Sequence, residues 1–193
     1  FGVPREQGHE RFNDTLKFLR QAWTSEERFT FEGQHWTLRD VVIEPRPIQQ
    51  PHPPIWVGAA SRESITQAAT LGLKLFLDQV ATFDEVATRV NIYRDAQAQA
   101  GLPSHTNDIA LTRPLLLAAD TSERETLLTA HLGTLAFLSG STSKAANNPF
   151  YSDPDGRRAR TESGAILGCA DECINRLNRL RDIGVAQVLF TRT

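Results

Sequence analysis

The residues best suited to bind a ligand are small or carry hydroxyl groups, and they follow a short apolar run. Residues 54–58 are typical of a β-strand. Small residues, among them Ala60, follow it, and Ser61 and Ser64 then open a helical segment. Unpaired N–H groups and the positive dipole end of a helix attract anions, and small residues let the backbone come close. The pattern therefore predicts a phosphate-binding site. It also fits a plain N-cap at Ser61, with Ser64 as a weak capping-box partner.

The elements that would position this site alternate along the chain. Apolar runs predict strands, and segments with an apolar face at helical spacing predict helices. Such alternation is typical of parallel βα units, although four strands are too few to close a barrel of eight. The predicted strands cover residues 54–58, 73–78, 109–118 and 186–190, and the predicted helices cover 62–72, 83–100, 121–138 and 170–183.

Other segments have a different character. Residues 9–23 predict an amphipathic helix, and residues 28–38 alternate around a Glu-Gly turn, as in a β-hairpin. A proline-rich connector follows at 44–54, where neither helix nor central strand fits. Residues 139–168 are rich in Ser, Asn, Asp, Pro and Gly, so we expect a long loop there and interpret it as a lid candidate.

The composition narrows the class of protein. The 193 residues are 40% hydrophobic and 23% charged with a net charge of −2, which favours a globular domain without general attraction to nucleic acid or membranes. Two cysteines, Cys169 and Cys173, form no disulfide framework, so a reducing cytoplasm is expected. Five scattered histidines predict no metal site. Because the chain lacks methionine and opens on Phe1-Gly2-Val3-Pro4, we expect a piece of a longer polypeptide.

Several spaced motifs together resemble the luciferase-like flavin-dependent monooxygenases. The matching features are the helix that ends at Trp23, the hairpin from Phe31 to Trp36, the strand and serine run at 53–61, and the block that starts at Gly168. Cys169 stands where that family usually has a capping hydroxyl. The resemblance extends over essentially all 193 residues.

The resemblance implies an α/β fold in which residues 1–193 form one partial domain, the C-terminal half of a (β/α)8 TIM barrel. The complete enzyme would use reduced FMN and O2 to oxygenate a small organic substrate, with a separate reductase supplying the reduced flavin. Alternatives are hydride transfer with the deazaflavin F420, or a non-catalytic flavin- or phosphate-binding half-barrel. A homo-oligomer is expected, and neither nucleic acid nor membrane is an expected partner. The half-barrel alone is expected to be inactive, because catalytic residues would lie upstream.

The resemblance also suggests roles for individual residues. Ala60, through its backbone, and Ser61 and Ser64 would hold the flavin phosphate. Gln79 follows the strand at 73–78 and would hydrogen-bond to the flavin ring or the substrate, unless it is a solvated loop residue. Its neighbour Asp78 would serve the same mouth of the barrel or act as a local cap.

Four arginines are further candidates. Arg113 lies inside an apolar strand, so it either faces the barrel mouth or, as we favour, pairs with a carboxylate between strand and helix. Arg157, Arg158 and Arg160 lie in the expected lid. They would close over the flavin phosphate or an anionic substrate, or they are solvated loop charges.

Overall fold

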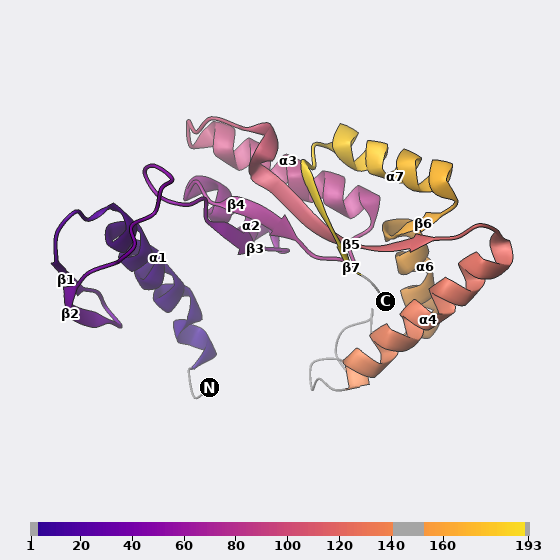
Figure 1. Cartoon of the computed structure of the whole chain (residues 1–193), viewed down its shortest axis with the longest axis horizontal. Helices are drawn as coiled ribbons and strands as arrows, with labels where there is room; N and C mark the ends of the chain where they lie inside the picture. The colour runs from indigo at the N-terminus through magenta and orange to yellow at the C-terminus, as the bar shows by residue number, and fades with distance from the viewer. Residues whose placement is uncertain (1–3, 141–152, 192–193) are drawn as a thin grey trace. The chain divides into compact units, whose positions relative to one another are not determined.

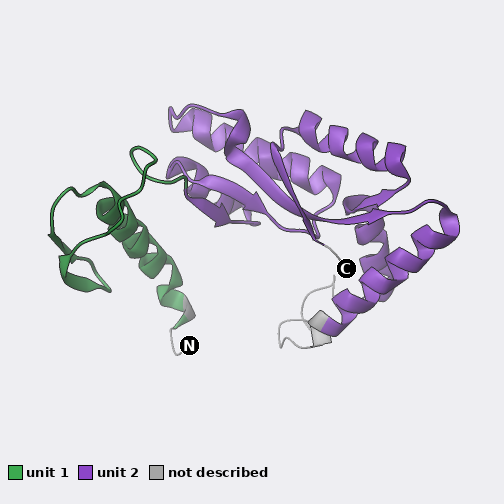
Figure 2. Ribbon diagram, viewed as in Figure 1, with its two compact units in different colours: residues 1–54 green, residues 55–193 purple. Residues whose placement is uncertain are grey.

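The computed structural model describes residues 4–140 and 153–191. The chain divides into two compact units, residues 1–54 and residues 55–193 (Figure 2). The sequence did not predict this division. No helix in the described ranges is long and apolar enough to cross a membrane.

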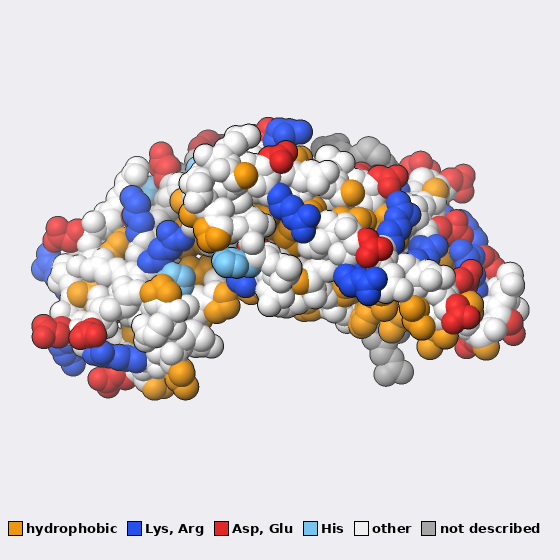
Figure 3. All heavy atoms as spheres, turned by 90° about the horizontal axis from the view of Figure 1, so that it is seen from above, with side chains coloured by type: hydrophobic (Ala, Val, Ile, Leu, Met, Phe, Trp, Pro, Cys, Tyr) orange, Lys and Arg blue, Asp and Glu red, His pale blue; other side chains and the backbone are white. Residues whose placement is uncertain are grey.

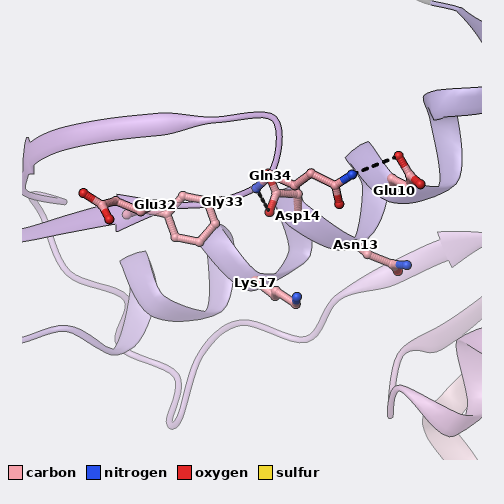
Figure 4. Close-up of a pocket in the computed structure, with 8 residues that line it drawn as sticks. Glu10, Asn13, Asp14, Lys17, Glu32, Gly33 and Gln34 are labelled. Atoms are coloured by element: carbon pink, nitrogen blue, oxygen red, sulfur yellow. Dashed lines mark hydrogen bonds between the residues drawn. The ribbon is translucent and has the colours of Figure 1, made fainter.

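The first unit packs a helix against a β-hairpin, as the sequence predicts. Asp14, on the helix, is buried, and its carboxylate accepts a hydrogen bond from the backbone N–H of Gln34 (3.2 Å) in the hairpin turn (Figure 4). It accepts a second one from the N–H of His35 (2.8 Å). A Cβ at Gly33 would overlap that carboxylate, so the turn needs glycine there. The elements of this unit are η1 (Arg5–Gln7), α1 (Gly8–Thr24), β1 (Phe29–Glu32) and β2 (Thr37–Val41).

The second unit alternates strands and helices (Figure 1). Its elements are β3 (Trp56–Gly58), α2 (Arg62–Thr70), β4 (Lys74–Leu77), α3 (Phe83–Gln99), η2 (Thr106–Asp108), β5 (Ile109–Leu117), α4 (Thr121–Gly140), α6 (Pro154–Gly164), β6 (Ile166–Gly168), α7 (Ala170–Ile183) and β7 (Gln187–Thr191).

The sheet of this unit is parallel throughout the described residues. Strand β4 lies between β3 and β5, and β5 pairs with both β7 and β6. The four predicted strands therefore lie parallel and in sequence order, which confirms the α/β class. The number of strands was wrong, because β6 adds a fifth. It joins β5 beyond Pro114, along Leu115–Leu117, whereas β7 pairs with Ala110–Pro114.

The prediction of a loop over residues 139–168 is wrong for its second half. Residues 154–164 form α6, and residues 166–168 form β6. Asp153 caps α6 by accepting a hydrogen bond from the Asp155 N–H (3.1 Å), and proline stands at the first helical position. The same residue types also favour turns, which explains the wrong prediction. Residues 141–152 of the expected lid lie outside the described residues.

Two hydrophobic clusters hold this unit together. The larger one joins β4, β5, β6 and β7 to α2, α3 and α7 and contains Leu75, Leu77 and Leu111, all fully buried. The smaller one consists of Leu116, Leu128, Ala165 and Leu167, from β5, α4 and the β6 region. Apolar side chains also reach the surface (Figure 3). Large exposed ones on the strands are Leu115, Leu117, Leu189 and Phe190.

Candidate functional site

A pocket of about 340 Å³ lies at the carboxyl ends of β3 and β4. Its walls are mainly apolar and are formed by Gly58, Ala59, Ala60, Phe76 and Asp78. Ligands of parallel α/β proteins bind at this end of the strands. The fold thus brings together two residues that the sequence selected, Ala60 and Asp78.

The start of α2 adjoins this pocket through Ala60. Ser61 is the N-cap of α2, and its Oγ accepts a hydrogen bond from the Ser64 N–H (3.2 Å). The Ser64 Oγ donates to the Ser61 carbonyl (3.0 Å), and the two hydroxyl oxygens lie 3.1 Å apart. The N-cap interpretation is therefore confirmed. Phosphate binding by the same hydroxyls stays a prediction.

A carboxylate shows the electrostatic character of this helix terminus. A hydrogen bond from its own backbone N–H, and a second one with the Ser61 side chain, hold the pKa of Glu63 below its usual value. Both interactions favour the charged form of the carboxyl group. The first turn of α2 therefore stabilises a negative charge, as a phosphate site requires.

Asp78 organises the turn that follows β4. Its Oδ1 accepts hydrogen bonds from the N–H groups of Val80 (2.9 Å) and Ala81 (2.9 Å), and its Oδ2 pairs with the Arg89 Nη1 (2.7 Å). Partial burial alone would raise the pKa of Asp78, but these hydrogen bonds and the Arg89 charge outweigh it and lower the pKa. Asp78 is thus a local cap, as one of the two interpretations expected. It also lines the pocket.

Arg113 has partners that the sequence did not predict. Its side chain is fully buried, and it donates to the backbone carbonyls of Asp78 (Nη1, 2.8 Å), Ala81 (Nη2, 2.7 Å) and its neighbour Thr112 (Nη1, 3.1 Å). Burial lowers the pKa of Arg113 to about 10. The expected pair with a carboxylate is wrong, because the hydrogen-bond partners of Arg113 are backbone carbonyls. The alternative, that Arg113 faces the barrel mouth, stays a prediction.

Gln79 lies between Asp78 and Ala81, whose carbonyls Arg113 holds, and is half-buried. Within the ranges 4–140 and 153–191, neither its backbone N–H nor its side chain has a hydrogen-bond partner. A role in contacting flavin or substrate stays a prediction.

The three arginines of the expected lid belong to α6. Arg157 is buried, Arg158 pairs with Glu125 of α4 (2.6 Å), and Arg160 contacts both carboxylate oxygens of Glu85 on α3 (3.0 and 2.7 Å). The interpretation of these residues as solvated loop charges is therefore wrong. None of the three lines the pocket at Ala60.

Some residues around the pocket were missed by sequence reasoning. Phe76 and Gly58 form its walls, and Arg89 and Glu85 fix the adjoining turn. Only Glu85 had a recognisable signal, because Thr82 and Glu85 have the spacing of a capping box. The structure contains that capping box at the start of α3.

A second pocket, of about 310 Å³, lies in the first unit between α1 and the hairpin (Figure 4). Its walls include Glu10, Asn13, Asp14, Lys17 and Gln34, none of which the sequence selected. Across the described part of the chain, no group of three or more His, Cys, Asp or Glu residues is arranged to hold a metal ion.

Comparison with known proteins settles the family. The family model described as luciferase-like monooxygenase matches residues 1–187. The chain belongs to this family. The resemblance found in the sequence motifs is thereby confirmed.

Individual relatives are distant and longer. The FMNH2-dependent dimethylsulfone monooxygenase of Pseudomonas putida is 25% identical over 121 residues, which cover 63% of this chain and 32% of that protein. The oxygenase component of the flavin-dependent trigonelline monooxygenase of Acinetobacter baylyi is 22% identical, and the match covers 98% of this chain and 55% of the relative. The crystal structure of monooxygenase RslO1 from Streptomyces bottropensis superimposes with a TM-score of 0.71 at 26% identity, over 98% of this chain and 55% of the other. The chain spans about half or less of the length of these proteins.

Proposed function

We propose that this chain forms the phosphate-binding side of a flavin-dependent monooxygenase. The protein would use reduced FMN and O2 to oxygenate a small organic substrate. The observation that carries the proposal is the apolar pocket at the ends of β3 and β4, which has the N-terminus of α2 at its border. FMN, when bound, supplies the redox chemistry with oxygen.

The residues present fit an FMN phosphate. Ala60 is exposed and has no long side chain, so a ligand can approach the backbone there. The hydroxyls of Ser61 and Ser64 stand 3.1 Å apart at the helix start and can turn to donate to phosphate oxygens. The N-terminus of α2 already stabilises the Glu63 carboxylate. A phosphate would take over donors that now serve that carboxylate.

The turn after β4 would form the opposite wall. Asp78 lines the pocket, and Gln79, next to it, has an amide side chain that can donate to or accept from a flavin or substrate. Apolar Phe76 would exclude water from the same space. The proposal assigns no ligand contact to Arg157, Arg158 or Arg160. Arg158 and Arg160 form ion pairs with other helices, and none of the three lines the pocket.

The proposal includes the architecture of the whole protein. The parallel sheet of residues 55–193 would be the C-terminal half of a (β/α)8 barrel, since longer relatives share this fold over half of their length. We also propose a cytoplasmic protein that receives reduced flavin from a separate reductase. The description of one relative as an oxygenase component supports the reductase. Exposed strand residues such as Leu189 and Phe190 support a homo-oligomer.

Ligand titration and oxygen uptake test the proposal in the full-length protein. We expect FMN to bind more tightly than riboflavin, and O2 consumption to require reduced FMN. Substrate oxidation with F420 and without O2 would replace the monooxygenase assignment by the hydride-transfer alternative. Absence of binding to FMN, riboflavin and F420 alike would overturn the proposal.

A further inference from the structure

The turn between β4 and α3, residues 78–82, is fixed from several sides. Arg89, on α3, holds the Asp78 carboxylate (2.7 Å), and Arg113, on β5, holds the carbonyls of Asp78 and Ala81 (2.8 and 2.7 Å). The Thr82 N–H donates to Glu85 (2.8 Å), which is itself paired with Arg160 on α6. Side chains from three elements beyond the turn thus determine its conformation.

The last turn of α6 adds a steric constraint on the same segment. A Cβ at Gly164 would lie 2.9 Å from the Ala81 carbonyl oxygen, closer than packed atoms allow. The Ala81 carbonyl is therefore confined between the backbone of α6 and the guanidinium of Arg113. This contact leaves the turn little room to move.

Burial of Arg113 has a large unfavourable desolvation free energy. The residue is completely buried, its partners are neutral carbonyls, and its Nε has no hydrogen-bond partner in the described part of the molecule. A buried charge without a hydrogen-bonded carboxylate has a large desolvation cost, and an apolar residue is often as stable in its place. The arrangement is better explained by the geometry it imposes than by stability alone.

The imposed geometry determines which groups face a ligand. The peptide bond after Asp78 is trans, so its carbonyl and the N–H of Gln79 point in opposite directions. The Asp78 carbonyl accepts a hydrogen bond from Arg113 and therefore points toward it. The Gln79 N–H then lies on the side of the turn away from Arg113. Val80 and Ala81 have their N–H groups engaged by the Asp78 carboxylate. Within the described residues, the Gln79 N–H has no partner and remains able to donate to a ligand.

We propose that Arg113 is a positioning residue for ligand binding, which fixes the 78–82 turn as the wall of the pocket opposite the start of α2 and presents Gln79 to the ligand. The inference rests on the proposed flavin-binding function. Arg113 itself does not contact the ligand and acts through the two backbone carbonyls.

The test measures FMN and riboflavin affinities of full-length variants by fluorescence titration. Arg113→Met should weaken both ligands by a similar factor, about tenfold to a hundredfold, as a displaced binding wall does. The factor should be similar because the turn lies across the pocket from the phosphate donors of α2. Arg113→Lys keeps a donor that can reach one carbonyl, so it should restore part of the affinity. Gly164→Ala should weaken binding in the same way without removing any charge.

Tyr93→Phe, a substitution in α3, provides a matched control that acts on the other end of β4. The buried Tyr93 hydroxyl donates to the carbonyl of Leu73 (2.8 Å), just before β4 begins, whereas Arg113 acts just after β4 ends. This variant should lower the melting temperature and leave both affinities unchanged.

The outcomes separate this inference from the function on which it rests. Flavin affinities of Arg113→Met equal to those of Tyr93→Phe would show that Arg113 is only structural and would overturn the positioning role. If the unmodified protein binds neither flavin, the proposed function fails, and the positioning role fails with it. Weaker binding in Arg113→Met with partial recovery in Arg113→Lys supports the inference.

Discussion

Ser61 and Ser64 allow helix capping and phosphate binding to be separated by single substitutions. Ser61→Ala removes the oxygen that accepts the Ser64 N–H, so α2 loses its N-cap. Ser64→Ala leaves that cap in place, because the donor is the backbone N–H and the acceptor is the Ser61 Oγ. Both variants remove one hydroxyl that would donate to a phosphate.

The expected magnitudes differ for the two variants. Loss of an N-cap costs about 0.5–2 kcal/mol, which lowers the melting temperature of a domain of this size by about 1–8 °C. Ser64→Ala loses an exposed hydroxyl bond but gains helix propensity, so its melting temperature should change little. A hydrogen bond to a charged group is worth about 1.5–3 kcal/mol. Each substitution should therefore weaken FMN binding about 10–200-fold.

The decisive quantity is the ratio of riboflavin to FMN dissociation constants, because riboflavin lacks the phosphate. Both serine variants should lower this ratio, while riboflavin affinity itself stays the same. Asp153→Ala is the control, since Asp153 caps α6 through the Asp155 N–H (3.1 Å) and does not line the pocket. This control should lose thermal stability without any change in the ratio.

One result would refute the reasoning. If the ratio is unchanged in both serine variants and only Ser61→Ala melts at a lower temperature, the serines are helix caps and nothing more. Partial binding that survives both substitutions fits the prediction, because the backbone N–H groups and the helix dipole remain.

Three further outcomes follow from the structure. Gly184→Ala should destabilise the chain more than Gly72→Ala in urea unfolding, because φ at Gly72 (+66°) lies in the left-handed region that other residues can enter, whereas φ at Gly184 (+106°) lies outside it; equal costs would contradict this. The lowered pKa of Asp78 means that its contribution to stability is present above the unfolded pKa near 3.8 and disappears as the pH falls through the lower folded value. Asp78→Asn should therefore reduce the melting temperature at pH 7 and flatten its decline below about pH 4, and parallel curves for the two proteins would be the contrary result. The isolated 193-residue chain should self-associate through the exposed side chains of its strands, and sedimentation as a compact monomer at micromolar concentration would argue against it.

Local patterns predicted the elements that position the pocket. The strands at β3, β4 and β5 are short apolar runs, and Ser61 and Gly72 mark the two ends of α2 by their preference for a cap and for positive φ. Such signals depend on residues close together in the chain. They located Ala60 and Asp78, which the fold then brings to one pocket.

Contacts between distant residues could not be predicted in the same way. The carbonyls held by Arg113 lie 35 and 32 positions earlier in the chain, and a carbonyl acceptor has no sequence signature. The sequence therefore suggested only a carboxylate partner or a position facing the barrel mouth for Arg113. Strand β6 has three residues, too few for a periodic pattern. The helix before it, α6, begins after Asp153, a residue type that favours turns as well as helix caps.

The change of partners along β5 has a consequence for cooperativity. Before Pro114 the strand belongs to the larger hydrophobic cluster, and beyond it Leu116 belongs to the smaller one with Leu128 and Leu167. Proline has no N–H to donate to the ladder, so the strand is least continuous in hydrogen bonding at this junction. Regions with few buried apolar contacts open at a lower free energy than the main core. The amides of α4 should therefore exchange with solvent deuterium through a partial opening that leaves β4 and α3 protected, whereas β6 stays attached to the larger cluster through the buried Ile166.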